Sequence, residues 1–360
     1  MLYFPNMNWR VWILLFIKNY FASLKRRTEL SLPYGSLKIG LVADNLTQAS
    51  LESECQVRHL TPNNYRKIFR QWKPDLLFVE SAWQGIKETW KYKIASYPGH
   101  AERNNYLLHQ MLSEARDVGI PAIFWNKEDN VHYDRFIDSA KLFEYVFTVD
   151  ENCIPRYQSD VPSARVIQPL MFAVQPRFHH AGVATKKIGH SCFVGSYGAH
   201  IHPQRRQWQD LLFEVFSRFG LDVYDRNSSR KASHYRYPVF PGLTVRPKVP
   251  YSLTAQLYKS YRFNLNVNTI EASPTMFSRR LIEILAVGAV AVSTPSLAAS
   301  RHFSECCSIV SSRQELEAIV QWSAAQYNEA LERARYGAEL VANHHTWMHR
   351  LEQIEASGCF

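Results

Sequence analysis

The stretch LNVNTIEASPTMFSRRLIEILAVGAVAVSTPS, Leu265 to Ser296, decides the fold. It contains an apolar run, a polar loop, a helical segment from Phe277 to Val287, and a second apolar run from Ala289 to Ser293. Gly288 permits a tight turn between the helix and the second run. Two short apolar strands joined by a helix predict a right-handed βαβ unit in a parallel sheet.

The same alternation extends outward through most of the chain. The other runs that predict buried strands are Leu37–Asp44, Asp75–Ser81, Pro121–Asn126, Tyr145–Asp150, His190–Tyr197, Gly220–Asn227 and Tyr261–Val267. Predicted helices between them are Tyr65–Trp72, Tyr106–Val118, Arg135–Phe143 and Arg205–Phe219. We therefore predict an α/β protein with two Rossmann-like, doubly wound domains that face a central cleft, where ligands bind beyond the carboxyl ends of the strands.

The division into domains follows from length and from one irregular segment. A chain of 360 residues exceeds the roughly 250 to 300 residues at which single cores stop growing. Residues 168–189 lack periodicity and predict a linker. We expect an amphipathic segment at 1–34, Rossmann-like domains at 35–175 and 188–343, and a C-terminal helix at 344–360.

Composition excludes several classes of protein. Hydrophobic residues at 46% and charged residues at 21% exclude a disordered chain. The net charge of +10 suits nucleic acid, an anionic membrane or a phosphate-bearing substrate, and does not choose among them. The six cysteines form no CxxC motif, so we interpret them as reduced thiols of a cytoplasmic protein.

The N-terminal segment raises the question of a membrane. Trp9–Lys25 is aromatic and aliphatic, but Arg10 and Lys18 interrupt it, and it falls short of the roughly 20 residues that span a bilayer. Basic residues follow at 25–27. Two interpretations stay open: an interfacial helix lying peripherally on the inner face of the cytoplasmic membrane, or a helix packed on the body of the protein.

The loop and helix of the opening stretch carry a candidate anion site. The polar loop Thr269–Thr275 leads into a helix whose first turn contains Ser278, Arg279 and Arg280. Helix N-termini bind phosphate, and arginines add charge-assisted hydrogen bonds to a diphosphate. Glu283, one turn on, could accept hydrogen bonds from a ribose diol. The alternative is an ordinary ion-pair cluster on the surface of a helix.

The motifs resemble a known family. The helix is similar to the donor-nucleotide helix of two-domain (GT-B) glycosyltransferases. The motifs that resemble the CgeB-like, or spore maturation protein B-like, glycosyltransferases are LLFVESAWQG (76–85), FWNKEDNVHYDRF (124–136), VGSY (194–197) with HPQRR (202–206), LDVYDRN (221–227), FNLNVN (263–268) with SPTMFSRR (273–280), and HHTWMHR (344–350). The resemblance covers Leu76 to Arg350.

This resemblance implies transfer of a sugar from a nucleotide-sugar donor to an acceptor hydroxyl, in cell-envelope or surface glycan synthesis. The acceptor would be a glycan or a lipid-linked molecule on the side of residues 35–175, and the donor would lie on the side of 188–343. The expected donor-binding residues are Gly195, Ser196, Arg205, Tyr224, Arg226, Asn268, Ser273, Thr275, Phe277, Ser278, Arg279, Arg280 and Glu283. Because Thr275 stands eight positions before Glu283, the paired-glutamate signature of many retaining enzymes is incomplete, and the stereochemistry stays open.

The N-terminal half supplies candidates for the acceptor side. Glu80, Ser81 and Trp83 follow a predicted strand, and Trp83 could stack on a sugar face or cap the core. The loop after another strand contains Glu128, Asp129 and His132. An inverting transferase needs a general base, for which Asp129 and Glu128 are the first candidates and His132 the third. The alternative is a solvated loop with a helix cap.

We expect no metal and no cofactor besides the nucleotide sugar as co-substrate. The sequence has no Asp-x-Asp pair, and His200 with His202 supplies only two possible ligands. A catalytically inactive nucleotide- or sugar-binding protein of the envelope or spore coat, on the same scaffold, is the alternative function. A nucleic-acid partner is disfavoured, because the basic residues are scattered and form no known recognition module.

Overall fold

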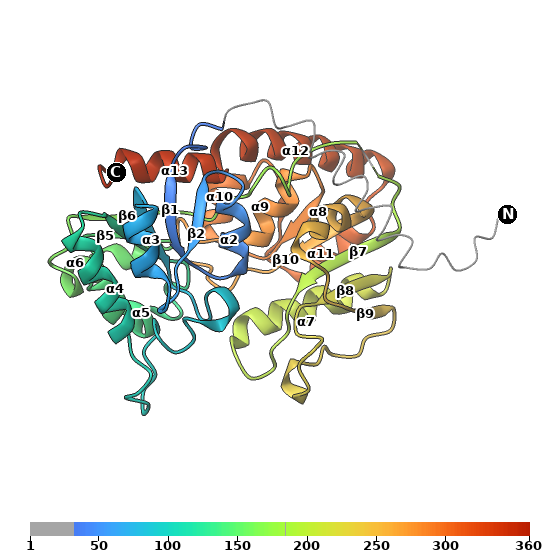
Figure 1. Ribbon diagram of the computed structural model, residues 1–360. Coiled ribbons are helices and arrows are strands. Elements are labelled where there is room, and N and C mark those ends of the chain that lie inside the picture. The colour runs from blue at the N-terminus through green and yellow to red at the C-terminus, as the bar shows by residue number, and fades with distance from the viewer. Residues whose placement is uncertain (1–31, 184) are drawn as a thin grey trace, which may run out of the picture.

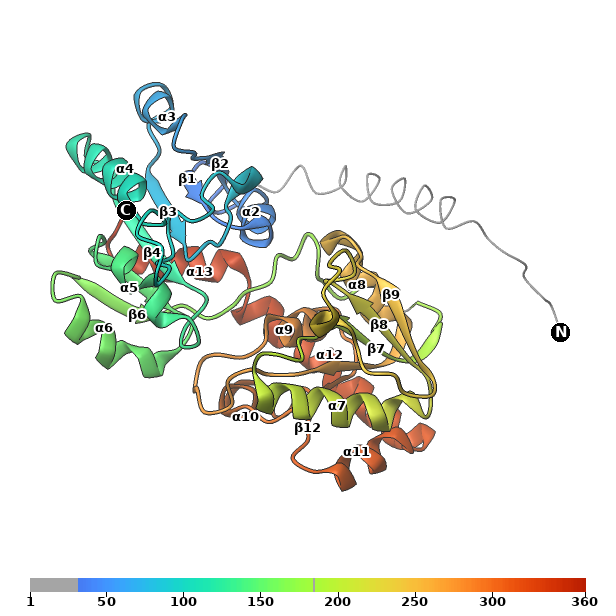
Figure 2. The ribbon, with the colours of Figure 1, turned by 90° about the horizontal axis from the view of Figure 1, so that it is seen from below.

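The computed structural model describes residues 32–183 and 185–360. It contains two separate six-stranded parallel sheets, with strand orders β2-β1-β3-β4-β5-β6 and β12-β11-β10-β7-β8-β9. Figure 2 shows the two sheets in separate lobes. This arrangement confirms the predicted fold of two doubly wound α/β domains. The amphipathic helix predicted within 1–34 lies almost wholly outside the described residues.

The N-terminal domain contains the first sheet. Its strands are β1 (Lys38–Val42), β2 (Gln56–His59), β3 (Leu76–Glu80), β4 (Ala122–Asn126), β5 (Tyr145–Thr148) and β6 (Val166–Pro169). One face is covered by α3 (Tyr65–Gln71), α4 (Tyr106–Asp117), α5 (Tyr133–Ala140) and α6 (Ile154–Asp160). The other face is covered by α2 (Asn45–Leu51) and the C-terminal helix α13 (Trp347–Ala356).

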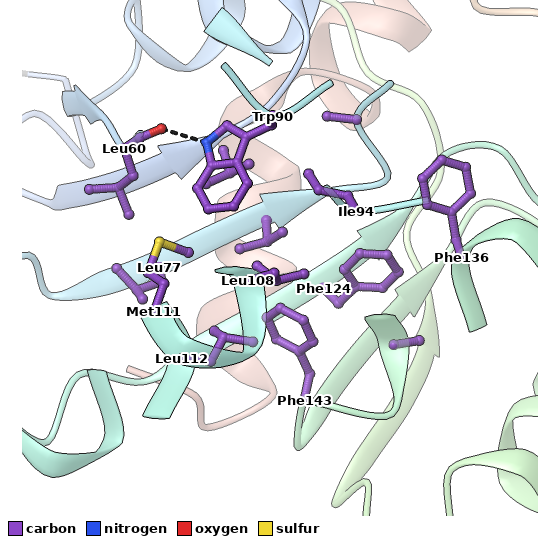
Figure 3. Close-up of a cluster of buried hydrophobic side chains, with 14 of the residues drawn as sticks. Leu60, Leu77, Trp90, Ile94, Leu108, Met111, Leu112, Phe124, Phe136 and Phe143 are labelled. Carbon is purple, nitrogen blue, oxygen red and sulfur yellow. Dashed lines mark hydrogen bonds between the residues drawn. The ribbon is translucent and has the colours of Figure 1, made fainter. Parts of the chain in front are cut away.

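Burial on both faces explains why the central strands are continuously apolar. Every residue of β3 is buried, with Leu77 and Val79 packed on one side of the sheet and Leu76 and Phe78 on the other. Figure 3 shows the first of these clusters, in which the Trp90 indole donates a hydrogen bond to a backbone carbonyl after β2 at 2.7 Å. The sheet is therefore a rigid base for the loops at its carboxyl edge.

The C-terminal domain contains the second sheet. Its strands are β7 (Gly189–Gly195), β8 (Leu221–Asp225), β9 (Leu243–Pro247), β10 (Tyr261–Asn266), β11 (Ala291–Ser293) and β12 (Ser308–Ile309). One face is covered by α8 (Tyr251–Ser260), α9 (Arg279–Ala286), α10 (Leu297–Phe303) and the end of α12 (Ala324–His344). The other face is covered by α7 (Pro203–Ser217), α11 (Arg313–Val320) and the beginning of α12.

The chain crosses between the domains twice, and the two crossings are bonded together. Val174 of the linker donates its N–H to His345 O at 2.9 Å, and Trp347 N donates to Val174 O at 3.1 Å. Arg350 adds a hydrogen bond from Nε to Met171 O at 2.8 Å. Figure 1 shows the result, with α12 on the C-terminal domain and α13 continuing across the N-terminal one.

Several further features of the structure concern smaller expectations from the sequence. All six cysteines are free and buried. Residues 168 and 169, assigned to the linker from sequence, belong to β6. Three short 3-10 helices occur at Ile86–Glu88, Glu151–Cys153 and Ser233–Tyr235. No helix within 32–183 or 185–360 is long and apolar enough to cross a membrane.

Candidate active site

Three arginines from three elements converge at the carboxyl edge of the second sheet. Arg280 lies in the first turn of α9, Arg205 lies in the first turn of α7, and Arg226 directly follows β8. Burial, with contributions from Arg226 and Arg205, lowers the pKa of Arg280 to about 10. Positive charges that repel each other are thus held together at the end of the strands, and we call them the arginine cluster.

Arg280 is the fixed centre of this cluster. Its side chain is only 7% exposed, its Nε donates to Val194 O at 2.6 Å, and its guanidinium lies 4.3 Å from the centre of the Phe193 ring. Gly195 leaves room for it, because a Cβ there would lie 2.7 Å from Arg280 Nη2. The end of β7 is thereby shaped around the guanidinium.

Several donors in the arginine cluster are buried without a partner. Arg280 Nη1, Arg205 Nε and the hydroxyl of the neighbouring Tyr237 have no hydrogen bond. Within the described part of the chain, none of Arg205, Arg226 and Arg280 forms a salt bridge. Unpaired buried donors are costly, and a cluster of cations that form no salt bridge is suited to an anion such as a diphosphate.

Arg279 points elsewhere, although it adjoins Arg280 in sequence. Its Nε lies 3.2 Å from Glu283 Oε1, one helical turn on, and its guanidinium lies 5.9 Å from the centre of the Tyr251 ring. Tyr258 donates to Glu283 Oε2 at 3.4 Å. Glu283 is 6% exposed, so this ion pair is buried and does not match the surface-cluster alternative.

The remaining donor-side residues hold the loop before α9 in shape. Asn268 Oδ1 accepts from Ser278 N at 2.9 Å, while its Nδ2 donates to Thr294 O at 2.9 Å. Ser273 Oγ accepts from Met276 N at 2.9 Å. These contacts fix the direction in which α9 begins, which positions Arg280.

Three further residues that were expected to bind the donor form contacts within the protein. Phe277 is buried in the core, and the Tyr224 hydroxyl is hydrogen-bonded to the Tyr261 hydroxyl at 2.8 Å. The backbone carbonyl of Ser196 accepts from Gln209 Nε2 at 3.1 Å. Thr275 contacts the other domain: its Oγ1 donates to Val149 O and accepts from Glu151 N, both at 2.9 Å.

In the N-terminal domain, Lys127 joins three carboxylates at the carboxyl edge of the sheet. Its Nζ lies 2.6 Å from Glu128 Oε1, 3.1 Å from Glu80 Oε1 and 3.5 Å from Asp44 Oδ2. Burial raises the pKa of the fully buried Glu80, against the opposing effect of Lys127. Asp44 accepts hydrogen bonds from three successive backbone N–H groups at 83–85. This edge of the first sheet is therefore predominantly acidic.

Beside these carboxylates lie the rings of Trp83, His132 and Phe136, which we call the aromatic wall. The Trp83 ring contacts His132 edge-to-face at 5.1 Å and Phe136 at 5.0 Å between centroids. Ser81 lies beneath, with its Oγ accepting from Lys127 N at 3.0 Å. Trp83 is half-buried, so part of its surface is open to a ligand.

His132 is one of the titratable groups near the other domain. Burial lowers its pKa below 6.5, although Glu128 acts to raise it, and His132 in turn lowers the pKa of His202 in the C-terminal domain. Among the described residues, none forms a hydrogen bond with the His132 ring. Its imidazole is thus neutral at neutral pH and able to accept a proton.

Asp129 points into the core. It is 0% exposed, and its carboxylate accepts from Asn126 Nδ2 at 2.7 Å, Thr148 Oγ1 at 2.6 Å and the Tyr157 hydroxyl at 2.8 Å. Burial raises its pKa to about 7. Both oxygens are occupied, so this position does not suit the general-base role that the sequence suggested first for Asp129.

Sequence reasoning did not single out Asp44, Lys127, Tyr237, Tyr251 or Tyr258. Two of them carried a usable signal, since Asp44 and Lys127 directly follow strand patterns and had to lie at the carboxyl edge of the sheet. Within the described residues, no group of three or more His, Cys, Asp and Glu side chains could hold a metal ion.

Comparisons with known proteins concern the fold and the C-terminal half of the chain. Residues 201–356 match the family model described as glycosyl transferase-like. No curated protein matches the chain at a significant level. Solved structures are similar in fold at low sequence identity.

Sucrose-phosphate synthase from Thermosynechococcus elongatus is 12% identical, with a TM-score of 0.51 over 82% of this chain and 75% of its own. T4 phage BGT, in complex with UDP and Mn2+, is 14% identical, with a TM-score of 0.53 over 90% and 98%. An alpha-glucosyltransferase in complex with UDP and DNA is 10% identical, with a TM-score of 0.58 over 90% and 99%. The chain therefore has the GT-B fold, with a glycosyl transferase-like region in its C-terminal half.

Proposed function

We propose that the protein is a glycosyltransferase that moves a sugar from a nucleotide-sugar donor to an acceptor hydroxyl. The observation that carries this proposal is the arginine cluster, in which buried donors of Arg205 and Arg280 lack partners and, among the described residues, none of the three arginines forms a salt bridge. In a transfer reaction the leaving nucleoside diphosphate gains negative charge at the moment the sugar departs. Cations and N–H groups already fixed in place stabilise that charge without reorganising.

The donor would lie along α9. Its diphosphate would contact Arg205, Arg226 and Arg280, and its ribose would contact Glu283. Tyr258 links the proposed ribose and diphosphate positions. It donates a hydrogen bond to Glu283. Burial and the charge of Glu283 raise the pKa of Tyr258, and the charge of Arg280 acts to lower it. A nucleoside diphosphate would thus follow the first turns of the helix.

The acceptor would lie against the aromatic wall of the N-terminal domain. We assign the general base to His132, which is neutral, free of hydrogen bonds among the described residues, and near the opposite domain. Glu128 would stabilise the imidazolium after proton transfer. Trp83 would pack on the acceptor ring, as aromatic side chains do on apolar sugar faces.

The assignments of subfamily, pathway and acceptor rest on the resemblance found in the sequence. Membership in the CgeB-like family would place the enzyme in cell-envelope or surface glycan synthesis, with a glycan or lipid-linked acceptor. The basic and aromatic composition of residues 1–34 supports peripheral contact of a cytoplasmic protein with the inner face of the membrane. The nucleotide sugar is the only small molecule that this mechanism requires.

Thermal denaturation with a panel of nucleoside diphosphates and nucleotide sugars tests the proposal. A ligand at 100 times its Kd should stabilise the protein by about 2.7 kcal/mol. The same nucleotide sugar, labelled in its sugar, should then be transferred or hydrolysed. Binding without either reaction would support the catalytically inactive alternative, and no response to any nucleotide would refute the donor site.

A further inference from the structure

A hydroxyl group at the interface between the domains both donates and accepts a hydrogen bond. Thr275 belongs to the C-terminal domain, in the donor loop, which we define as residues 268–278. Its Oγ1 donates to Val149 O and accepts from Glu151 N, both at 2.9 Å and both in the N-terminal domain. Asn152 Nδ2 adds a bond to Ala272 O at 3.2 Å. The donor loop is thus attached to the end of β5.

On the C-terminal side, the donor loop transmits position to α9. Asn268 holds Ser278 N at 2.9 Å and is itself held by Thr294, whose Oγ1 accepts from Asn268 N at 2.9 Å. Ser278 is the N-cap of α9, and Arg280 follows two residues later. Any shift of Thr275 is therefore passed to the arginine cluster through a short, internally bonded loop.

On the N-terminal side, the end of β5 holds the acceptor loop, which we define as residues 126–132. Thr148 Oγ1 donates to Asp129 Oδ2 at 2.6 Å, and Asn130 Nδ2 donates to Asp150 Oδ2 at 2.8 Å. His132 N donates to Glu128 O at 3.0 Å, which closes the loop on itself. Glu128 and His132, which flank residues 129–131, carry the proposed acceptor chemistry.

We propose that Thr275 is a positioning residue, whose hydroxyl fixes the acceptor loop of one domain relative to the donor loop of the other. The role assigned to it rests on the proposed function, while the mechanical link can be tested without any substrate. Through Thr275, Thr148 and Asp129, the distance between the proposed phosphate-binding arginines and His132 is set by hydrogen bonds and by the short backbone segments between them. Reacting groups must be placed closely, since a misplacement of about 1 Å can cost about a hundredfold in rate.

Hydrogen exchange of the ligand-free protein tests the link. T275V removes the hydroxyl and leaves Val149 O and Glu151 N unpaired, whereas T275S keeps the hydroxyl. Thr254 provides a matched control, because it is also 6% exposed and its Oγ1 makes two hydrogen bonds, at 2.8 Å each, on the C-terminal side of the interface. T254V therefore removes equivalent bonds without touching the acceptor loop.

We expect the amides of Lys127, Glu128 and His132, which are hydrogen-bonded in the acceptor loop, to exchange about tenfold faster in T275V. Exchange at these amides should be unchanged in T275S and in T254V. Faster exchange confined to 149–152 and to the donor loop would overturn the proposal. If T275V does not fold, the wild-type protein decides: bound nucleoside diphosphate should slow exchange in both loops, and protection of the donor loop alone would overturn it.

Kinetics then separate positioning from binding. T275V should keep the wild-type Kd for the nucleotide within about twofold, while kcat falls about a hundredfold and T275S restores it. Equal losses of nucleotide affinity and rate would mean that Thr275 serves the donor directly. Failure of the wild-type protein to bind any nucleotide would refute the proposed function, yet the exchange experiment on the free protein would still decide whether the loops are linked.

Discussion

Replacing Arg280 with methionine should weaken nucleotide binding about a hundredfold while leaving the free protein about as stable as wild type. A pKa of about 10 in place of 12.5 corresponds to a penalty on the order of 3 kcal/mol for keeping this charge buried. The hydrogen bond from Nε to Val194 O, worth about 1.5 to 3 kcal/mol, opposes that penalty. Methionine has similar length and no charge, so we expect the free energy of unfolding to stay within about 1 kcal/mol.

Replacing Arg279 with methionine should, in contrast, destabilise the free protein. Arg279 is paired with Glu283, and R279M would leave that carboxylate buried without its cation. Breaking a buried ion pair costs about 3 to 5 kcal/mol. Because Arg279 is partly exposed, we expect the lower end of this range. The two variants form a matched pair in one helical turn.

Denaturant unfolding of both variants, with and without nucleoside diphosphate, is the assay. At 100 times its Kd, the nucleotide should stabilise the wild type by about 2.7 kcal/mol. At the same concentration R280M should gain only about 0.4 kcal/mol, which corresponds to a hundredfold weaker Kd. The reasoning would be refuted if R280M lost several kcal/mol in the free state and still responded fully to nucleotide, because Arg280 would then be a structural residue.

Four further outcomes are expected. H132Q should lower the rate of transfer by about 10² to 10⁴ without changing the nucleotide-induced stabilisation in a thermal-shift assay. The rate of the wild-type enzyme should fall as the pH is lowered, with a midpoint below pH 6.5. E128Q should move that midpoint to lower pH, since Glu128 acts to raise the pKa of His132. An unchanged midpoint in E128Q would contradict the proposed pairing of Glu128 with His132. Because the pKa of Asp129 is raised from 3.8 to about 7, its contribution favours folding below pH 3.8 and is lost as pH rises through 7. D129N should therefore flatten the fall in unfolding free energy between these limits, measured by urea titration. Deletion of Met1 to Arg27 should release the protein from anionic liposomes in a sedimentation assay and leave it folded, whereas aggregation of the truncated chain would show a core helix.

The central strands could be predicted from the sequence, and the edge strands could not. Those predicted, such as β3 (LLFVE), are covered on both faces and are therefore almost entirely apolar. The four that were missed, β2, β6, β9 and β12, are the outer strands of the two sheets. β9 is largely exposed and reads LTVRP, a short alternation without a continuous apolar run. Burial on two faces creates the pattern, so strands with one free edge lack it.

The candidate site was predictable in place and only partly in detail. The end of each strand fixed which loops meet, so Arg205, Arg226 and Arg280 were expected at one edge. The divergence of Arg279 from Arg280 follows from the roughly 100° turn per residue of a helix, but which of the two faces the sheet depends on the helix's rotation. The inward direction of Asp129 depends on Thr148 and Tyr157, which come from other elements.

The two domains place opposite charges at the edges that meet. On the C-terminal side the arginine cluster forms no salt bridge within the described residues, while on the N-terminal side Asp44, Glu80 and Glu128 surround the single cation of Lys127. Sugar transfer needs this polarity, since negative charge grows on the leaving diphosphate while the acceptor hydroxyl loses a proton to its base. A field directed from one domain to the other favours both changes at once. Because the field depends on the separation of the domains, the hydrogen bonds of Thr275 would affect the rate through distance alone.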